Sequence, residues 1–99
     1  MYGTVARMKV KPGQAEAFVA FGKEFDGQRR PKGYIGQHVY RLDADANEFI
    51  LVVVFEDKES YHANANDPEQ DKDYRQMRDM LEADPVWHDG EVVYSFHTS

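Results

Sequence analysis

The sequence predicts an α+β fold with the element order β-α-β-β-α-β, and three observations lead to this prediction. Hydrophobic and polar residues alternate with a period of two in three segments, as they do in half-buried strands. In two other regions the hydrophobic residues recur at spacings of three and four, as in amphipathic helices. A further segment, residues 49–55, is apolar throughout and predicts a strand that is covered on both faces.

The first half of the chain begins with a predicted strand and helix. Residues 2–10 alternate, and the Lys-Pro-Gly-Gln segment that contains Pro12 ends this strand. A helix is predicted from residue 14 to about residue 29, because its Phe residues fall on one stripe that would face the core. These residues are Phe18, Phe21 and Phe25. Gly22 lies inside the helix, and we expect it to permit a close approach to the sheet.

Two antiparallel strands are predicted next. Residues 34–42 alternate, with Tyr34, Gly36, His38 and Tyr40 on one face. A short turn rich in Asp and Asn separates this segment from the apolar strand 49–55. A turn of this length joins neighbouring antiparallel strands, so the two segments should form a hairpin.

The second half of the chain predicts a helical region in two pieces. Residues 56–65 form the first piece, with Asp57 as the candidate N-cap and further acidic residues in the first turn. Pro68 interrupts the helical pattern, because proline cannot continue a helix from its interior. Residues 71–83 form the second piece, where Tyr74 and Leu81 lie on one stripe.

The last strand is predicted close to the C-terminus. Residues 84–90 contain Pro and Gly and predict a loop or turn. Residues 91–97 alternate and predict a strand, with Val92, Tyr94 and Phe96 on one face. The complete order is that of the ferredoxin-like split β-α-β fold. A chain of 99 residues has the size of one small domain, so we expect a single domain over residues 1–99.

The apolar strand at residues 49–55 also predicts how the chain assembles. In a ferredoxin-like sheet the helices lie on one face, so the other face of this strand would be exposed. An exposed apolar sheet face is a large patch that favours association. The same face of a second copy is a self-complementary cover, and we therefore expect a homodimer packed sheet to sheet.

Composition and charge exclude several classes of protein. The formal net charge is −6 and the one basic cluster, residues 28–33, is short, so we expect no nucleic-acid partner. The sequence has no Cys, and its four His form no closely spaced ligand pair, so we expect no metal site. The apolar runs are too short for a membrane span or a signal peptide, which predicts a cytoplasmic protein without a membrane partner.

Several short motifs together resemble a known family. The first is Lys-Pro-Gly after the first strand, the second is Pro-Lys-Gly-Tyr-Ile-Gly at residues 31–36, and the third is Asp-Lys-Glu-Ser-Tyr-His-Ala-Asn after the apolar strand. In this order they resemble the antibiotic biosynthesis monooxygenase-like domains of the dimeric α+β barrel superfamily. The resemblance covers nearly the whole chain. The family often has Trp where this sequence has Phe55.

The resemblance implies a dimer whose two sheets form a barrel, with a pocket in each subunit between sheet and helices. Many members of the family are oxygenases that need neither metal nor flavin and act on phenolic or quinol-like substrates, whereas others degrade haem. The haem-degrading branch uses an Asn, a Trp and a His, and this sequence has Ala6, Asn64 and Tyr74 near those positions. The resemblance therefore implies a monooxygenase without a cofactor, acting on a small aromatic ligand.

Three residues are candidates for catalysis. An oxygenase of this kind has to deprotonate the phenol of its substrate, hold the resulting anion and keep water out. A His side chain can act as a base near neutral pH, and His38 would do so if its strand face looks toward the helices. The alternative is a half-buried His that is hydrogen-bonded to a neighbour. Asn64 and Tyr74 would donate hydrogen bonds to a phenolate or peroxide oxygen in the pocket that the resemblance implies.

Four further residues are candidates for binding the substrate: Tyr61, Trp87, Met77 and Phe21. Tyr61 precedes Asn64 by three residues, so the two share a helix face, whereas His62 should be turned away. The alternative is an ordinary polar helix end that leads into a loop. A Trp in a loop combines a large apolar area with one polar group, so Trp87 would close the mouth of a pocket or cap the edge of the core.

A second class of function stays open. The same pocket would serve a non-catalytic domain for ligand binding or assembly, because the sequence shows no compelling acid–base pair. Haem binding through Tyr74 or His38 is a further alternative, although it would depart from the haem-degrading branch.

Overall fold

The computed structural model describes residues 1–28 and 31–98. The elements are β1 (Tyr2–Lys9), α1 (Ala15–Gln28), β2 (Tyr34–Arg41), β3 (Glu48–Phe55), α2 (Lys58–Ala65), α3 (Pro68–Arg78) and β4 (Val86–Glu91). This is the predicted order, with the second helical region in two pieces. The end predicted for the first helix, at about residue 29, lies outside the described residues, as do Arg29 and Arg30 of the basic cluster at residues 28–33. In the described part of the chain, no helix is long and apolar enough to cross a membrane.

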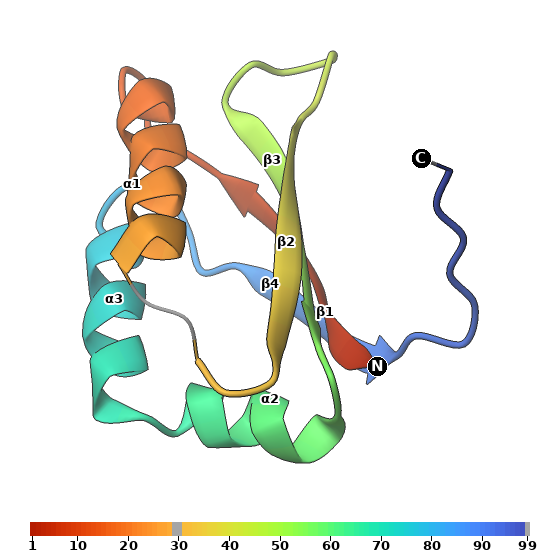
Figure 1. Ribbon diagram of the computed structural model, residues 1–99. Coiled ribbons are helices and arrows are strands. Elements are labelled where there is room, and N and C mark those ends of the chain that lie inside the picture. Colours follow the sequence, from red (N-terminus) through yellow and green to blue (C-terminus); the bar gives the residue numbers. More distant parts are fainter. Residues whose placement is uncertain (29–30, 99) are drawn as a thin grey trace.

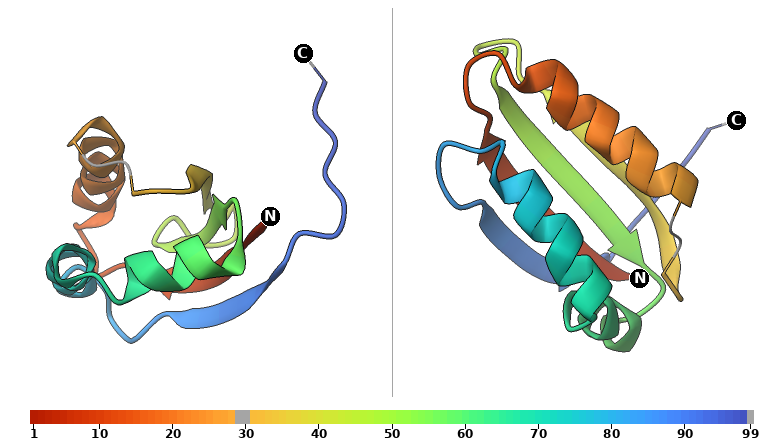
Figure 2. Two further views of the ribbon diagram at one scale, coloured as in Figure 1. Left: turned by 60° about the horizontal axis from the view of Figure 1, so that its bottom comes forward. Right: turned by 90° about the vertical axis from the view of Figure 1, so that its left-hand side faces the viewer.

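The described strands form one antiparallel sheet in the order β2-β3-β1-β4. Figure 1 shows α1 and α3 on one side of this sheet, with α2 across its lower end. In the right-hand view of Figure 2, α1 runs beside β2 and β3 while α3 runs beside β1 and β4. The predicted ferredoxin-like α+β fold and its β2–β3 hairpin are therefore confirmed.

The core lies between the helices and the inner face of the two interior strands, β1 and β3. Alternation places Met8 of β1 and Phe49 of β3 on this face, and both side chains are almost fully buried. Phe18 of α1 packs against Phe49, with 4.9 Å between the ring centroids. Burial of an aromatic or long aliphatic side chain contributes about 2 kcal/mol, so these contacts hold α1 on the sheet.

The Phe stripe of α1 divides between the core and a cavity that is partly open to solvent. Phe18 is buried as predicted, but Phe21 and Phe25 are only half-buried and border the cavity. The expectation for Gly22 is wrong, because a Cβ at this position meets nothing within 4 Å outside its own helix. Gly22 borders the cavity and no close approach to the sheet requires glycine there.

Capping side chains set where α2 and α3 begin. Asp57 is the N-cap of α2 as predicted, and its carboxylate accepts a hydrogen bond of 2.8 Å from the backbone N–H of Ser60. The start of α3 lies at Pro68 and not at residue 71, since Asp67 caps it and proline suits the first turn of a helix. Acidic caps thus define both helix starts on this side of the molecule.

The end of α3 lies at Arg78, before the predicted residue 83. The backbone after this helix turns to pair with the end of β1, where Met80 accepts a hydrogen bond of 2.9 Å from the Lys11 N–H. The Glu82 N–H donates a bond of the same length to the carbonyl of Lys9. Tertiary pairing therefore ends the helix, which the helical spacing of the sequence does not reveal.

The predicted position of the last strand is wrong. β4 covers Val86–Glu91, which was predicted to be a loop, and it pairs with residues 2–7 of β1. Residues 92–98 form no regular element and extend on the side of the sheet away from the helices, as Figure 1 shows. Their apolar side chains are strongly exposed, with Val93 at 87 %, Tyr94 at 81 % and Phe96 at 71 %.

The position of β4 follows from where its partner strand starts. Glu91 is opposite Tyr2, and the Val92 N–H makes a final hydrogen bond of 2.9 Å to the carbonyl of Met1. β1 begins at Tyr2, so the ladder between β1 and β4 ends at this point. The alternation of residues 92–97 is a strand-like pattern that pairs with no strand among the described residues.

Gly3 provides a test of the packing between β1 and β3. A Cβ on Gly3 would collide with the carbonyl oxygen of Val53, so Gly3→Ala should lower the free energy of unfolding by about 2 kcal/mol or more. Gly22→Ala is the matched control, because its Cβ meets open space and alanine favours a helix by about 1 kcal/mol. Urea denaturation of both variants measures the two changes, which should have opposite signs. Equal effects would contradict the close approach at Gly3.

Candidate functional site

A cavity of about 870 Å³ lies between the helices and the inner face of the sheet. Its size falls within the range of pockets that bind small organic molecules. Side chains of all three described helices border it, together with side chains from each of the described strands. The helices of Figure 2 therefore cover the sheet without filling all the space above it.

Aromatic side chains form a continuous wall on one side of the cavity. The ring of Phe25 lies 6.3 Å from that of Tyr34, and Tyr34 lies 5.6 Å from Phe55. Phe55 in turn lies 5.7 Å from Tyr61 of α2. Three successive aromatic pairs thus connect α1, the sheet and α2 with the edge-on and tilted geometries that such pairs prefer. This aromatic wall, formed by Phe25, Tyr34, Phe55 and Tyr61, provides a surface for a flat ring.

Six of the seven site residues predicted from the sequence border this cavity. They are Phe21 of α1, Tyr61 and Asn64 of α2, Tyr74 and Met77 of α3, and Trp87 of β4. Asn64 already has an interaction within the protein. Tyr74 makes no hydrogen bond with another described residue, so its hydroxyl is available to a ligand. The roles of these six residues in binding and catalysis stay predictions.

His38 does not lie in the cavity. It is opposite Val52 on the face of the sheet that the helices leave open, whereas the neighbouring Gln37 and Val39 border the cavity. The cause is an irregularity of the β2–β3 pairing between Tyr34 and Gly36, which turns Tyr34 to the inner face and His38 to the outer one. The condition for His38 to act as a base in this cavity is therefore not met.

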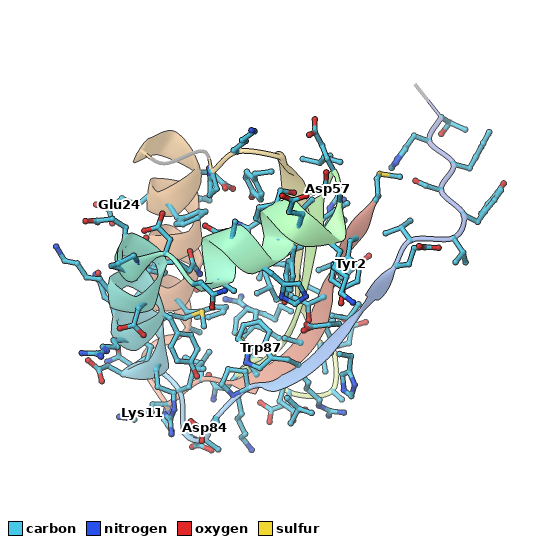
Figure 3. The ribbon with its side chains drawn as sticks, turned by 90° about the horizontal axis from the view of Figure 1, so that it is seen from below. Tyr2, Lys11, Glu24, Asp57, Asp84 and Trp87 are labelled. Atoms are coloured by element: carbon cyan, nitrogen blue, oxygen red, sulfur yellow. The ribbon has the colours of Figure 1, made fainter. Side chains whose placement is uncertain are left out.

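Trp87 reaches the cavity from a strand and not from a loop. It is opposite Ala6 in the β1–β4 ladder, which puts its side chain on the inner face of the sheet. The small Ala6 side chain leaves room for the indole, and the ring of Tyr74 lies 6.2 Å from it. Figure 3 shows Trp87 on the inner side of β4, toward α3. Trp87 and Tyr74 form a further aromatic pair beside the cavity, separate from the aromatic wall.

One carboxylate that the sequence analysis missed joins α1 to β2 at the cavity. Asp26 Oδ1 accepts a hydrogen bond of 2.8 Å from the Tyr34 hydroxyl, and Oδ2 accepts one of 3.1 Å from Gln37 Nε2. Both oxygens of Asp26 are therefore engaged by neighbouring side chains. Helical spacing could have identified Asp26 as a cavity residue, because it follows Gly22 by four residues and so lies on the same face of α1.

Two further residues that the sequence pattern does not reveal, Thr4 and Asp89, lie beside Tyr61 of α2. The Tyr61 hydroxyl donates a hydrogen bond of 2.8 Å to Oδ1 of Asp89 on β4. Burial and this bond raise the pKa of Tyr61 to about 12. The nearby Thr4 hydroxyl lowers the pKa of Tyr61, although Thr4 Oγ1 does not meet the geometry of a hydrogen bond. Thr4, Tyr61 and Asp89 all border the cavity, and we call them the hydroxyl cluster.

His62 lies closer to the cavity than its helical position predicts. Its ring is 5.3 Å from that of Tyr61 and 5.8 Å from that of Tyr2. The short helix α2 rests with one end over β1, so its flank as well as its inner face meets the sheet, as Figure 3 shows near Tyr2. His62 therefore borders the cavity beside the hydroxyl cluster.

Acidic groups outnumber basic groups around the cavity. The acidic residues are Glu16, Asp26, Asp71, Asp73 and Asp89, and the basic ones are Lys23 and Arg41. Arg41 is in addition paired with Glu16, with 3.3 Å between the charged atoms. The cavity therefore favours a neutral ligand over an anionic one. Among the described residues, no three His, Asp or Glu side chains gather as they would to hold a metal ion.

The raised pKa of Tyr61 can be tested by titration. The protein has six Tyr, and one of them should lose its proton near pH 12 and not near the ordinary 10.0. Because the folded state holds this proton more tightly, the stabilisation is complete below about pH 10 and is lost as the pH rises toward 12. Tyrosinate absorbance measures the titration. Tyr61→Phe should remove the highest step, whereas Tyr94→Phe should keep it.

Comparison with known proteins places the chain in a family. The family model for antibiotic biosynthesis monooxygenases matches residues 1–76. A candidate antibiotic biosynthesis monooxygenase from Chloroflexus aurantiacus is 22 % identical, with 97 % of this chain and 96 % of that chain covered and a TM-score of 0.78. SnoaB, a cofactor-independent oxygenase from Streptomyces nogalater, is 16 % identical over 95 % of this chain and 94 % of that chain, with a TM-score of 0.76.

A conserved protein from Methanosarcina mazei is likewise 16 % identical, with 90 % of this chain and 89 % of that chain covered and a TM-score of 0.77. At these identities the solved structures show a shared fold. No curated protein sequence matches the chain. The match of the family model over most of the chain agrees with the motifs at its turns and helix starts, and the chain belongs to the antibiotic biosynthesis monooxygenase family.

Proposed function

We propose that the protein is a monooxygenase that oxidises a small aromatic, quinol-like substrate without a metal or flavin, and that the cavity is its active site. The observation that carries the proposal is an aromatic-walled cavity of about 870 Å³ in a chain of this family. A monooxygenase without an added reductant takes both electrons from the substrate itself. One atom of O₂ then enters the substrate, and the other leaves as water.

Asn64 and Tyr74 hold the oxygen that becomes negatively charged during the reaction. An amide and a phenol both donate hydrogen bonds, and donors that are already in place stabilise developing charge most effectively in a site that excludes water. The two residues come from different helices and border the same cavity. The available hydroxyl of Tyr74 supports this role.

The remaining predicted residues bind the ring of the substrate. Phe21 and Met77 offer apolar surface, while Tyr61 of α2 and Trp87 of β4 add aromatic faces. Flat hydrophobic surfaces of this kind favour a flat aromatic substrate and displace water from it. The fold likeness to SnoaB, a cofactor-independent oxygenase, agrees with the proposed reaction class but adds no residue to the site.

A non-catalytic ligand-binding domain is the second candidate function. It is favoured by one observation, that His38, the side chain expected to act as base, lies on the outer face of the sheet. A binding protein would be stabilised by the aromatic ligand without consuming oxygen. Measurements of thermal stability and of oxygen uptake with the same naphthoquinol separate the two functions.

We also propose a homodimer that packs through the open face of the sheet. Apolar side chains on this face are Val5, Tyr40, Ile50, Val52, Val54 and Val86, which come from all the described strands. Val5 is 43 % exposed in the single chain although it lies on an interior strand. The exposed residues 92–98 extend on the same side and enlarge the apolar surface. A second copy would cover both features.

Oxygen uptake with a naphthoquinol tests the catalytic proposal. The protein should consume oxygen without added metal or flavin. Asn64→Ala and Tyr74→Phe should each lower kcat by about a hundredfold, because each removes a donor to the developing charge. Asn66→Ala and Tyr40→Phe are the matched controls, since neither residue borders the cavity. Uptake that is unchanged in both cavity variants would show that the site is assigned wrongly.

Sedimentation tests the proposed dimer. The protein should sediment as a dimer at micromolar concentration, and Val5→Lys should shift it to a monomer by placing a charge on the open sheet face. Ala17→Lys puts the same charge on the exposed side of α1 and should leave the dimer intact. A monomeric wild-type protein would contradict the proposed assembly.

A further inference from the structure

A buried hydroxyl group on the floor of the cavity has no hydrogen-bond partner. Thr4 is only 4 % exposed, and its Oγ1 makes no hydrogen bond with a described group. Burying a polar atom without a partner is costly, so such atoms are rare in native proteins unless a ligand engages them. Thr4 is on the inner face of β1 and borders the cavity, where a ligand can reach it.

The neighbouring strand places a carboxylate beside this hydroxyl. Asp89 is directly opposite Thr4 in the β1–β4 ladder. Side chains that face each other in this way have Cβ atoms about 5 Å apart, so a single ligand atom can touch both. Oδ1 of Asp89 accepts the hydrogen bond from Tyr61, and Oδ2 accepts none from another described residue. One oxygen of Asp89 therefore remains available as an acceptor.

The available groups match a hydroxyl. Thr4 can donate a hydrogen bond and Asp89 can accept one, and a ligand hydroxyl has both complementary capacities in one atom. A carboxylate or phosphate would offer acceptors only and would meet the negative charge of Asp89. The excess of acidic groups around the cavity acts against such an anion as well. The aromatic wall ends at Tyr61, next to this point.

We propose that Thr4, Tyr61 and Asp89 form a binding site for the hydroxyl group of a neutral phenol or quinol. The ligand oxygen accepts a hydrogen bond from Thr4 Oγ1, and its O–H donates to Asp89 Oδ2. The ring of the ligand lies along the aromatic wall. Tyr61 keeps its own proton at neutral pH and fixes Asp89 through the bond to Oδ1.

Asp89 can also accept the substrate proton, which His38 cannot do from the outer face of the sheet. This role of Asp89 rests on the proposed oxygenase function. The proton moves from the ligand oxygen to Asp89 Oδ2, and the electron pair of the broken O–H bond stays on the ligand oxygen. The products of this step are a neutral carboxylic acid and a phenolate. The Thr4 hydroxyl donates a hydrogen bond to the phenolate. This bond stabilises the phenolate and so disfavours the return of the proton from Asp89.

Anaerobic binding of naphthol and of its methyl ether, methoxynaphthalene, tests the site. The two probes differ in the O–H that the site is proposed to bind. The wild-type protein should bind naphthol roughly tenfold more tightly than the ether, because a hydrogen bond to a charged acceptor has about this effect. Asp89→Asn and Thr4→Val should each reduce this preference to about threefold or less. Ligand fluorescence or calorimetry gives the dissociation constants.

Two matched variants separate the site from general effects. Glu91→Gln removes a negative charge from the same strand outside the cavity and should leave the preference unchanged. Thr4→Ser keeps the hydroxyl and should keep the preference. Thr4→Val should melt at or above the wild-type temperature, since valine has the same shape and removes an unpartnered hydroxyl. A clear drop in melting temperature would show that the hydroxyl has a structural role and would overturn the proposal.

The outcomes distinguish this site from the proposed function. A preference for naphthol that is absent from the wild type, or that survives in both Asp89→Asn and Thr4→Val, overturns the hydroxyl-binding site even if oxygen is consumed. A preference that depends on both residues supports the site even if no quinol is oxidised. In that case the oxygenase function fails, and the site belongs to a ligand-binding protein.

Discussion

The pairing of β1 with both β3 and β4 is the constraint on which the rest of the structure depends. Because β1 is shared, its alternation fixes which residues of both neighbours face the helices. One row of side chains across the sheet shows the consequence, since Gln37, Val53, Thr4 and Asp89 are opposite one another in turn. Gln37 bonds to α1 at one end of the row, and Asp89 bonds to α2 at the other. The floor of the cavity is thus set by strand register.

Local patterns in the sequence predict most of the fold. The order of helices and strands, the hairpin and the N-cap Asp57 depend on neighbouring residues, and the structure agrees with each. The position of β4 depends on a partner strand at the opposite end of the chain, so alternation near the C-terminus predicts the wrong segment. Gly22 gives a similar lesson, because a helix spacing cannot show whether its neighbour is a sheet or a cavity.

The candidate site residues that lie on helices can be predicted from the sequence. Helical spacing puts Tyr61 with Asn64 and Tyr74 with Met77, and these residues border the cavity. On the strands the same reasoning fails for two physical reasons. The irregular pairing after Tyr34 reverses the faces of β2 and removes His38 from the cavity. Thr4 and Asp89 are neighbours because they pair across a ladder between segments that are distant in the sequence. Neither residue alone predicts this pairing.

The shared strand also determines when the molecule can fold. The β2–β3 hairpin closes through a short turn, so it can form early and locally. The partners of β1 come from the middle and the end of the chain, and β4 reaches it only when residues 86–91 return to residues 2–7. Closing so long a loop costs conformational entropy before any contact compensates for it. During synthesis β1 therefore emerges well before β4, and the cavity floor is completed only after residues 86–91 have been synthesised.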